Sequence, residues 1–338
     1  MSLVKSLMIF FCGYLLSGCT TIGSHVISNP DIYLSEAELL NASPESKGFK
    51  KQTFCLSNEN ICIPYLIAAP YNPKDFKKNQ AVFYNLHAGG NGVVNEISHR
   101  MKPDTFNRFK GTAVLLHGYG ASKEAMMVTA FYFRALGMKT VIPDLYGHGD
   151  SDEDFAFAAR EHLSFSKLLS ALKQKNELHE PVILVGHSMG SLPSVNLLLE
   201  YPEASGAILL APMLRFDEAA KRYLSYKFPN LSQLLSEQKL GDIVNNAMEE
   251  ARVDLADTDI IEKSKQSSKP ILFINSDIDS VSPALYFSQL KGEHIQLTEF
   301  KGRSHPSLIA FSTKDAEVVE QWLSTKIFKP SVISVDAE

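Results

Sequence analysis

A serine stands between two glycines in the segment Gly186-His-Ser188-Met-Gly190. The residues before it, Val182–Val185, form an unbroken apolar run, and those after it, Leu192–Leu199, have helical spacing. A serine on a sharp turn between a buried strand and a helix exposes its hydroxyl, and glycines two residues away let the two backbones pass closely. The helix N-terminus adds free N–H groups and a positive dipole end. This pattern predicts a nucleophile whose reaction develops negative charge.

A nucleophilic serine needs a base, and the base needs a group that orients it. In sites of this kind the acid and then the histidine follow the serine along the chain. Downstream of Ser188 stand His294, which lies in or beside a strand, and His305, which lies in a glycine-containing loop after that strand. We predict His305 as the base, because a loop at the carboxyl end of a strand can reach the serine. Asp277 and Asp279 both follow an apolar strand and both qualify as the acid.

Short apolar strands alternate with amphipathic helices from about residue 110 onward. This alternation favours an α/β fold with a mostly parallel central sheet and helices on both faces. Before it, residues 49–110 are predicted to form a β-rich N-terminal extension. The core is predicted at 111–213 and 270–328. Between its two parts, residues 214–269 contain no convincing strand and are predicted to form a helical cap, with an elaborate surface connection as the alternative.

The core motifs resemble those of a known family. The segments VLLHGYG, PDLYGHGDSD, VGHSMGS, PILFINSDIDSVSP and GRSHP are similar to the α/β-hydrolase superfamily, and within it to the monoacylglycerol lipase and lysophospholipase group, whose domain is also called serine aminopeptidase S33. In that family, the strand before the catalytic acid is usually followed by a glycine, two further residues and then the catalytic aspartate. Laid on this sequence, that pattern places Ser276 at the glycine and Asp279 at the acid. Asp277 remains the alternative.

An oxyanion hole requires two backbone N–H groups that face the developing charge. One is expected from the residue after the nucleophile, Met189. The resemblance implies that the second comes from Tyr119, in the loop His117-Gly-Tyr-Gly. A competing segment, Leu86-His-Ala-Gly-Gly-Asn-Gly, lies about a hundred residues before the serine and is interpreted as a flexible loop.

A metal site is not expected, although several potential ligands stand close together. Asp144, His148, Asp150 and Asp152 surround glycines that indicate a tight turn. His187 beside the nucleophile is interpreted as packing in the turn, with its side chain directed away from the serine hydroxyl. The predicted chemistry requires no cofactor.

The N-terminus has the pattern of an export signal. Lys5 precedes an apolar stretch too short to span a bilayer comfortably, and the stretch ends in Leu16-Ser-Gly-Cys19. This ending resembles a bacterial lipobox, which implies a signal peptide over 1–18 and a lipid anchor on Cys19. The following Thr20 resembles an outer-membrane address. The alternative is an ordinary signal peptide. Residues 19–48 are polar and are predicted to form a tether.

Charge and cysteine content restrict the partners further. The 338-residue chain carries a formal net charge of −5 and no block of Lys or Arg, so nucleic acid is not an expected partner. Cys55 and Cys62 flank a polar turn between two strand-like runs. In an exported chain they are predicted to form a disulfide across a hairpin, with two reduced thiols as the alternative.

Together these features predict a membrane-anchored serine hydrolase that cleaves lipophilic carboxylic esters of the lysophospholipid or monoacylglycerol type. The cap is rich in Leu, Tyr and Phe, which suits an apolar acyl channel. Two alternatives remain open. One is a serine peptidase or aminopeptidase on the same fold, and the other is a non-catalytic envelope lipoprotein.

Overall fold

The computed structural model describes most of the chain, and the architecture below rests on residues 20–30, 43–57, 59–77, 79–90 and 92–328. In these residues, eight strands form one sheet in the order β1-β2-β6-β5-β7-β8-β9-β10. β1 and β2 pair antiparallel at one edge, and the strands from β6 to β10 pair in parallel. The strands are β1 Lys50–Cys55, β2 Cys62–Ala68, β5 Gly111–Leu116, β6 Met138–Pro143, β7 Val182–His187, β8 Ala204–Leu210, β9 Ile271–Ser276 and β10 Ile295–Phe300.

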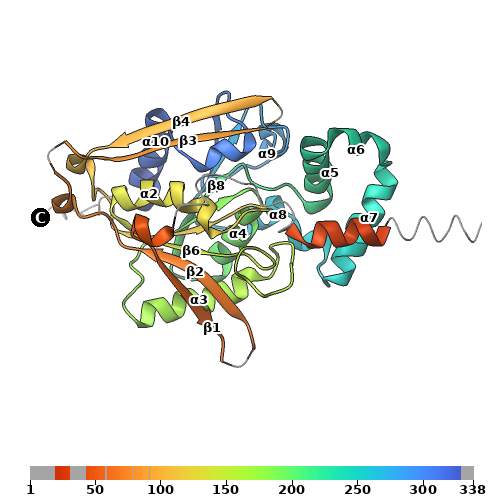
Figure 1. Cartoon of the computed structure of the whole chain (residues 1–338), viewed down its shortest axis with the longest axis horizontal. Coiled ribbons are helices and arrows are strands. Elements are labelled where there is room, and N and C mark those ends of the chain that lie inside the picture. Colours follow the sequence, from red (N-terminus) through yellow and green to blue (C-terminus); the bar gives the residue numbers. More distant parts are fainter. Residues whose placement is uncertain (1–19, 31–42, 58, 78, 91, 329–338) are drawn as a thin grey trace, which may run out of the picture.

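Both faces of the sheet are covered by helices, which explains the continuous apolar runs of the central strands. Along β7, Val182 and Leu184 belong to the apolar cluster on one face, and Ile183 and Val185 belong to the cluster on the other. The first face packs against α3 and α4, and the second packs against α2 and α10 (Figure 1). The helices are α2 Met127–Leu136, α3 Glu161–Gln174, α4 Ser191–Glu200, α8 Ile260–Gln266, α9 Ala284–Phe287 and α10 Thr313–Trp322.

The segment predicted as a helical cap, 214–269, contains helices and no strand among its described residues. α5 (Phe216–Lys227), α6 (Pro229–Leu234) and α7 (Glu237–Glu250) stand beside the core, whereas α8 packs against α4 (Figure 1). The boundary of the cap at residue 269 stays a prediction, and α8 is the part of the predicted segment that contacts a core helix. Ile260 and Ile261 of α8 are buried in the core cluster, and an apolar helix of this kind cannot be told from a cap helix by sequence pattern alone.

The segment Leu86–Gly92 is not the predicted flexible loop. β3 (Val82–Gly90) pairs antiparallel with β4 (Val93–Met101), so residues 86–90 of this segment form the end of a strand in a hairpin. The hairpin lies above α2 and α10 in Figure 1. Gly89 lies where a Cβ would be 2.4 Å from the carbonyl oxygen of Val93, so the hairpin backbone needs glycine there.

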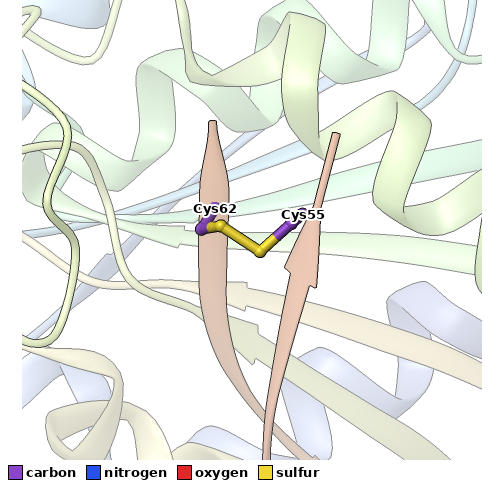
Figure 2. The surroundings of a disulfide bond; sticks show 2 residues. All are labelled: Cys55 and Cys62. Carbon is purple, nitrogen blue, oxygen red and sulfur yellow. A yellow bond between two sulfur atoms is a disulfide. The ribbon is translucent and has the colours of Figure 1, made fainter. Parts of the chain in front are cut away.

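The predicted disulfide is present. Cys55 and Cys62 are directly opposite each other on β1 and β2, and their sulfur atoms are bonded (Figure 2). The bond links the edge strand β1 to its neighbour β2.

Only part of the N-terminal region for which we made predictions lies within the described residues. The predicted signal peptide (1–18) and Cys19 lie outside the described residues. Residues 20–28 are helical and lie against α7 of the cap (Figure 1), so this part of the predicted tether is packed on the protein. Within the described part of the chain, no helix is both long enough and apolar enough to cross a bilayer.

Candidate active site

The sharp turn predicted at Ser188 is present at the end of β7. Ser188 has a φ of 51°, a left-handed conformation that is strained for a residue with a side chain. α4 begins three residues later at Ser191. Met189 and Gly190, which follow Ser188, are buried. Ser188 itself is partly exposed and is accessible to a substrate.

The glycines on either side of Ser188 allow two backbones to cross. A Cβ on Gly190 would lie 2.3 Å from the carbonyl oxygen of Leu116 and 2.5 Å from that of His117. A Cβ on Gly186 would lie 2.4 Å from the carbonyl oxygen of Gly190. These contacts are with backbone atoms, which cannot rotate away, so larger residues would displace the turn.

Replacing Gly190 with alanine is therefore expected to lower the free energy of unfolding by about 3 kcal/mol, the upper end for overpacking. Gly241→Ala is the matched control, because Gly241 lies inside α7 with no atom within 4 Å of an added Cβ. That change should stabilise the protein by about 0.5–1 kcal/mol. Urea denaturation measures both changes, and equal stability of the two variants would contradict the crossing described here.

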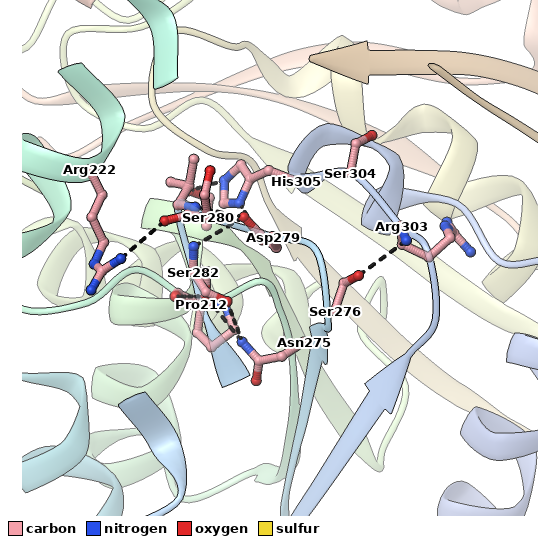
Figure 3. Close-up of polar contacts among 12 residues, drawn as sticks. Pro212, Arg222, Asn275, Ser276, Asp279, Ser280, Ser282, Arg303, Ser304 and His305 are labelled. Carbon is pink, nitrogen blue, oxygen red and sulfur yellow. Dashed lines mark hydrogen bonds and ion pairs between the residues drawn. The ribbon is translucent and has the colours of Figure 1, made fainter. Parts of the chain in front are cut away.

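His305 connects the serine to an aspartate. The Ser188 hydroxyl donates to Nε2 of His305 at 2.9 Å, and Nδ1 of His305 donates to Oδ2 of Asp279 at 2.8 Å. Figure 3 shows the His305 and Asp279 side chains facing each other. The three residues predicted from the sequence are therefore adjacent. His294 lies elsewhere, near the carbonyl of Ser264.

Asp279 is held as an ionised acceptor. Its other oxygen, Oδ1, accepts from the backbone N–H groups of Val281 (2.9 Å) and Ser282 (3.1 Å). Burial on its own raises the pKa of Asp279, but the charge of His305, its hydrogen bond and the two N–H groups outweigh this effect. The pKa of Asp279 is lowered as a result, and the carboxylate can fix the orientation of the imidazole.

Asp277 has a different environment. It is turned away from His305, and its carboxylate accepts from the backbone N–H of Gly302 at 2.7 Å. Ser276, at the position where the related motif has glycine, uses its hydroxyl to accept from the backbone N–H of Arg303 at 3.1 Å (Figure 3). Both side chains therefore attach the acid turn to the histidine loop.

The loop that carries His305 is also held from two other sides. Arg303 is buried; its Nε donates to the Ser307 hydroxyl at 3.1 Å and its Nη1 pairs with Asp315. Asn95 of β4 donates to the carbonyl of Gly302 at 2.7 Å and accepts from the N–H of Ser304 at 2.7 Å. Sequence reasoning missed Asn95, because no local signal links it to a loop more than 200 residues away.

His187 is not a second base. Its Nε2 donates to the carbonyl oxygen of His305 at 3.1 Å, so its ring supports the loop of the neighbouring histidine. Burial, followed by the charge of His305, lowers the pKa of His187 to about 3. It therefore stays neutral at pH values near 7.

The two predicted oxyanion-hole residues flank Ser188. Met189 follows it directly in the short turn of helix Ser188–Gly190. Tyr119 follows Gly118, whose added Cβ would lie 3.1 Å from the Cβ of Ser188, so the loop after β5 passes directly over the serine. The backbone N–H groups at 119 and 189 are thus carried by two segments that lie next to Ser188.

The predicted tight turn after β6 is held by a buried cation. Nζ of Lys123 contacts Oδ2 of Asp144 at 2.6 Å and Oδ2 of Asp150 at 2.7 Å. Two of the four candidate ligands, Asp144 and Asp150, converge on this ammonium group, and the described residues contain no cluster of three or more His, Cys, Asp or Glu that could hold a metal ion. The carboxylates of Asp144 and Asp150 stabilise the turn through their contacts with Lys123.

Ser188 and His305 open into an apolar cavity of about 510 Å³ between the core and the cap. This volume is typical of small-molecule sites. Its walls include Met213, Leu224 and Ile243, and of the described residues that line it, none is acidic. The cavity therefore suits an uncharged apolar group beside the nucleophile.

Comparisons with known proteins agree with the fold. A family model described as serine aminopeptidase, S33 matches residues 107–271, which include Ser188 but end before Asp279 and His305. No curated protein shows significant similarity to the chain.

Solved structures with a similar backbone match most of the chain. An esterase from Pyrococcus furiosus is 15% identical over 84% of this chain and 94% of its own, with a TM-score of 0.57. An esterase from Thermogutta terrifontis is 15% identical over 88% and 99%, with a TM-score of 0.54. Est1E from Butyrivibrio proteoclasticus, solved with ferulic acid, is 16% identical over 80% and 98%, with a TM-score of 0.52.

Proposed function

We propose that this chain, which is an α/β-hydrolase similar to the serine aminopeptidase S33 family, hydrolyses carboxylic esters with a lipophilic acyl group through an acyl-enzyme. One observation carries the proposal: the His305 imidazole bridges Ser188 and Asp279 at the wall of an apolar cavity. A serine that donates to an oriented imidazole is the arrangement required for nucleophilic acyl transfer.

The reaction follows from the contacts of each group. His305 accepts the Ser188 proton at Nε2 while the serine oxygen bonds to the ester carbonyl carbon. The N–H groups of Tyr119 and Met189 stabilise the resulting oxyanion. His305 then protonates the leaving alcohol as the ester C–O bond breaks, which leaves an acyl group on Ser188. Water, deprotonated by His305, attacks this acyl group, and release of the acid returns the proton to Ser188.

The cavity supports a single-chain lipid as the substrate, of the lysophospholipid or monoacylglycerol type. Its lining is almost entirely apolar, so the acyl chain gains free energy by leaving water, about 0.8 kcal/mol for each buried CH₂. An aminopeptidase would have to bind a free α-ammonium group, and no acidic side chain among the described lining residues offers a partner for one.

A substrate panel tests the proposal. We expect p-nitrophenyl esters of medium and long acyl chains, lysophospholipids and monoacylglycerols to be hydrolysed, and aminoacyl p-nitroanilides to be turned over poorly. A fluorophosphonate probe should label Ser188. Preference for the anilides would favour the peptidase alternative, and a folded protein that neither reacts with the probe nor hydrolyses any ester would favour a non-catalytic lipoprotein.

We further propose that the chain is anchored in a bacterial envelope, in the outer membrane, by lipid on Cys19. The support is the sequence Leu16-Ser-Gly-Cys19 after an apolar stretch. Cys19→Ala should leave ester hydrolysis unchanged and move the protein from the membrane to the soluble fraction, because stable anchoring needs the acyl chains. Fractionation followed by immunoblotting measures this. Membrane recovery of an exported Cys19→Ala protein would exclude lipid anchoring at this residue.

A further inference from the structure

The helix at residues 20–28 is bound to the cap by a buried polar contact. Ser24 is fully buried, and its hydroxyl accepts from Nδ2 of Asn246 at 3.1 Å and shares its hydrogen between the carbonyl of Thr20 in its own helix (3.0 Å) and the carbonyl of Ile243 (3.2 Å). Ile243 and Asn246 belong to α7, which lies beside this helix in Figure 1. A buried hydroxyl with a donor and an acceptor on the neighbouring helix fixes the relative positions of the two helices.

Close packing at the next position reinforces this contact. A Cβ on Gly23 would lie 2.7–3.0 Å from three side-chain atoms of Ile243. Only a residue without a side chain lets the two helices approach this closely, so the sequence Gly23-Ser24 fits the surface of α7 in both shape and polarity.

The other end of the helix is bound to the loop that carries a predicted oxyanion donor. The Tyr119 hydroxyl donates to the carbonyl oxygen of Ile27 at 2.9 Å. Ile27 lies in the last turn of the helix, where carbonyl groups have no partner within the helix. The Tyr119 ring also packs edge-on against Tyr223 of α5, at 5.5 Å between ring centroids. The helix therefore joins the cap to the loop over Ser188.

One face of the helix is directed into the active-site cavity. Ile22, Gly23, Val26 and Ile27 line the cavity that also contains Ser188 and His305. Their spacing of i, i+1, i+4 and i+5 places them on one side of a helix. His25, between them in sequence, is exposed on the opposite side and does not line the cavity.

The geometry points to residues 20–28 as a wall of the acyl-binding site, with Val26 and Ile27 as residues that set the acyl-chain length the enzyme accepts. This inference rests on the proposed esterase function. The ligand class is the hydrocarbon tail of a single-chain lipid ester. Short acyl groups are held near Ser188 by core residues and are insensitive to the helix, whereas longer chains pack against its apolar side chains.

A pair of opposite substitutions in the full-length protein tests the wall. Val26→Trp fills the cavity, so kcat/KM for p-nitrophenyl palmitate and octanoate should fall roughly ten-fold or more relative to p-nitrophenyl acetate. Val26→Ala enlarges the cavity and should shift the preference toward longer chains. His25→Trp, which adds the same bulk on the exposed face, should leave the chain-length profile unchanged. Circular dichroism spectra establish that each variant is folded.

A binding measurement separates failure of the inference from failure of the proposed function. In a Ser188→Ala background, cis-parinaric acid should bind with at least ten-fold lower affinity when Val26 is replaced by Trp, independently of any turnover. A wild-type protein that hydrolyses no ester would overturn the proposed function. Active and folded Val26 variants with the wild-type chain-length profile and parinaric acid affinity would overturn the inference alone, as would a His25→Trp effect equal to that of Val26→Trp.

Discussion

Ser188→Ala is expected to lower kcat for ester hydrolysis by roughly four to six orders of magnitude. The Ser188 oxygen is the atom that bonds to the substrate carbonyl, and its hydrogen bond to Nε2 of His305 has no replacement in alanine. Cavity binding and the oxyanion-hole N–H groups are retained in the variant. A small residual rate over uncatalysed hydrolysis is therefore expected, with KM for long-chain esters nearly unchanged.

Ser166→Ala is the matched control for this experiment. Ser166 is a partly exposed serine on α3 whose hydroxyl bonds only to the backbone carbonyl of Leu163 in the described structure. It should keep full activity and full labelling by a fluorophosphonate, whereas Ser188→Ala should lose both and keep the wild-type unfolding midpoint. Labelling at another serine, with activity retained in the folded Ser188→Ala protein, would contradict the assigned nucleophile.

The α/β-hydrolase fold was predictable because its signals are local. The apolar run at Val182–Val185 indicates a strand buried on both faces, and the structure divides its side chains alternately between two cores. Gly186 and Gly190 are required because the backbone at Gly186 passes close to the backbone at Gly190. Gly190 in turn passes close to the end of β5. Short-range steric requirements of this kind leave a mark in the sequence itself.

Contacts between segments far apart in the sequence have no local signal from which they could be predicted. Asn95 and the loop at Gly302 and Ser304 are separated by more than 200 residues, and each looks like an ordinary polar surface segment when read alone. Ser24 contacts Ile243 over a comparable separation. The polar segment 19–48 follows a predicted lipidation site, so the sequence predicts a tether. The apolar residues within 20–28 have packing partners only in the folded cap, and the local sequence does not indicate this packing.

The acid also could not be assigned from residue types alone, because two carboxylates two residues apart occupy the same turn. What separates them is the direction in which each side chain leaves the turn. Asp279 is directed inward to His305, and Asp277 is directed to the backbone of Gly302. The serine at 276, which departs from the related motif, has a physical role in this arrangement, because its hydroxyl binds the N–H of Arg303.

Asp279→Asn is the second change with a large expected effect, a loss of roughly four orders of magnitude in kcat. An asparagine amide facing Nδ1 can donate a hydrogen bond, which favours the histidine tautomer with the proton on Nε2. That tautomer cannot accept the proton of Ser188. The variant also lacks the negative charge that stabilises the imidazolium formed during the reaction. Substrate binding should change little, because Asp279 does not line the cavity.

Asp277→Asn is the control, since it makes the same chemical change two residues away. Its side chain does not contact His305, and an amide oxygen can still accept from the Gly302 N–H, so kcat should stay within a few-fold of wild type. Steady-state kinetics on one medium-chain p-nitrophenyl ester, with unfolding midpoints for both variants, compares the two. A collapse of kcat in Asp277→Asn together with near-normal activity in Asp279→Asn would reverse the assignment, and it would mean that the turn rearranges when substrate binds.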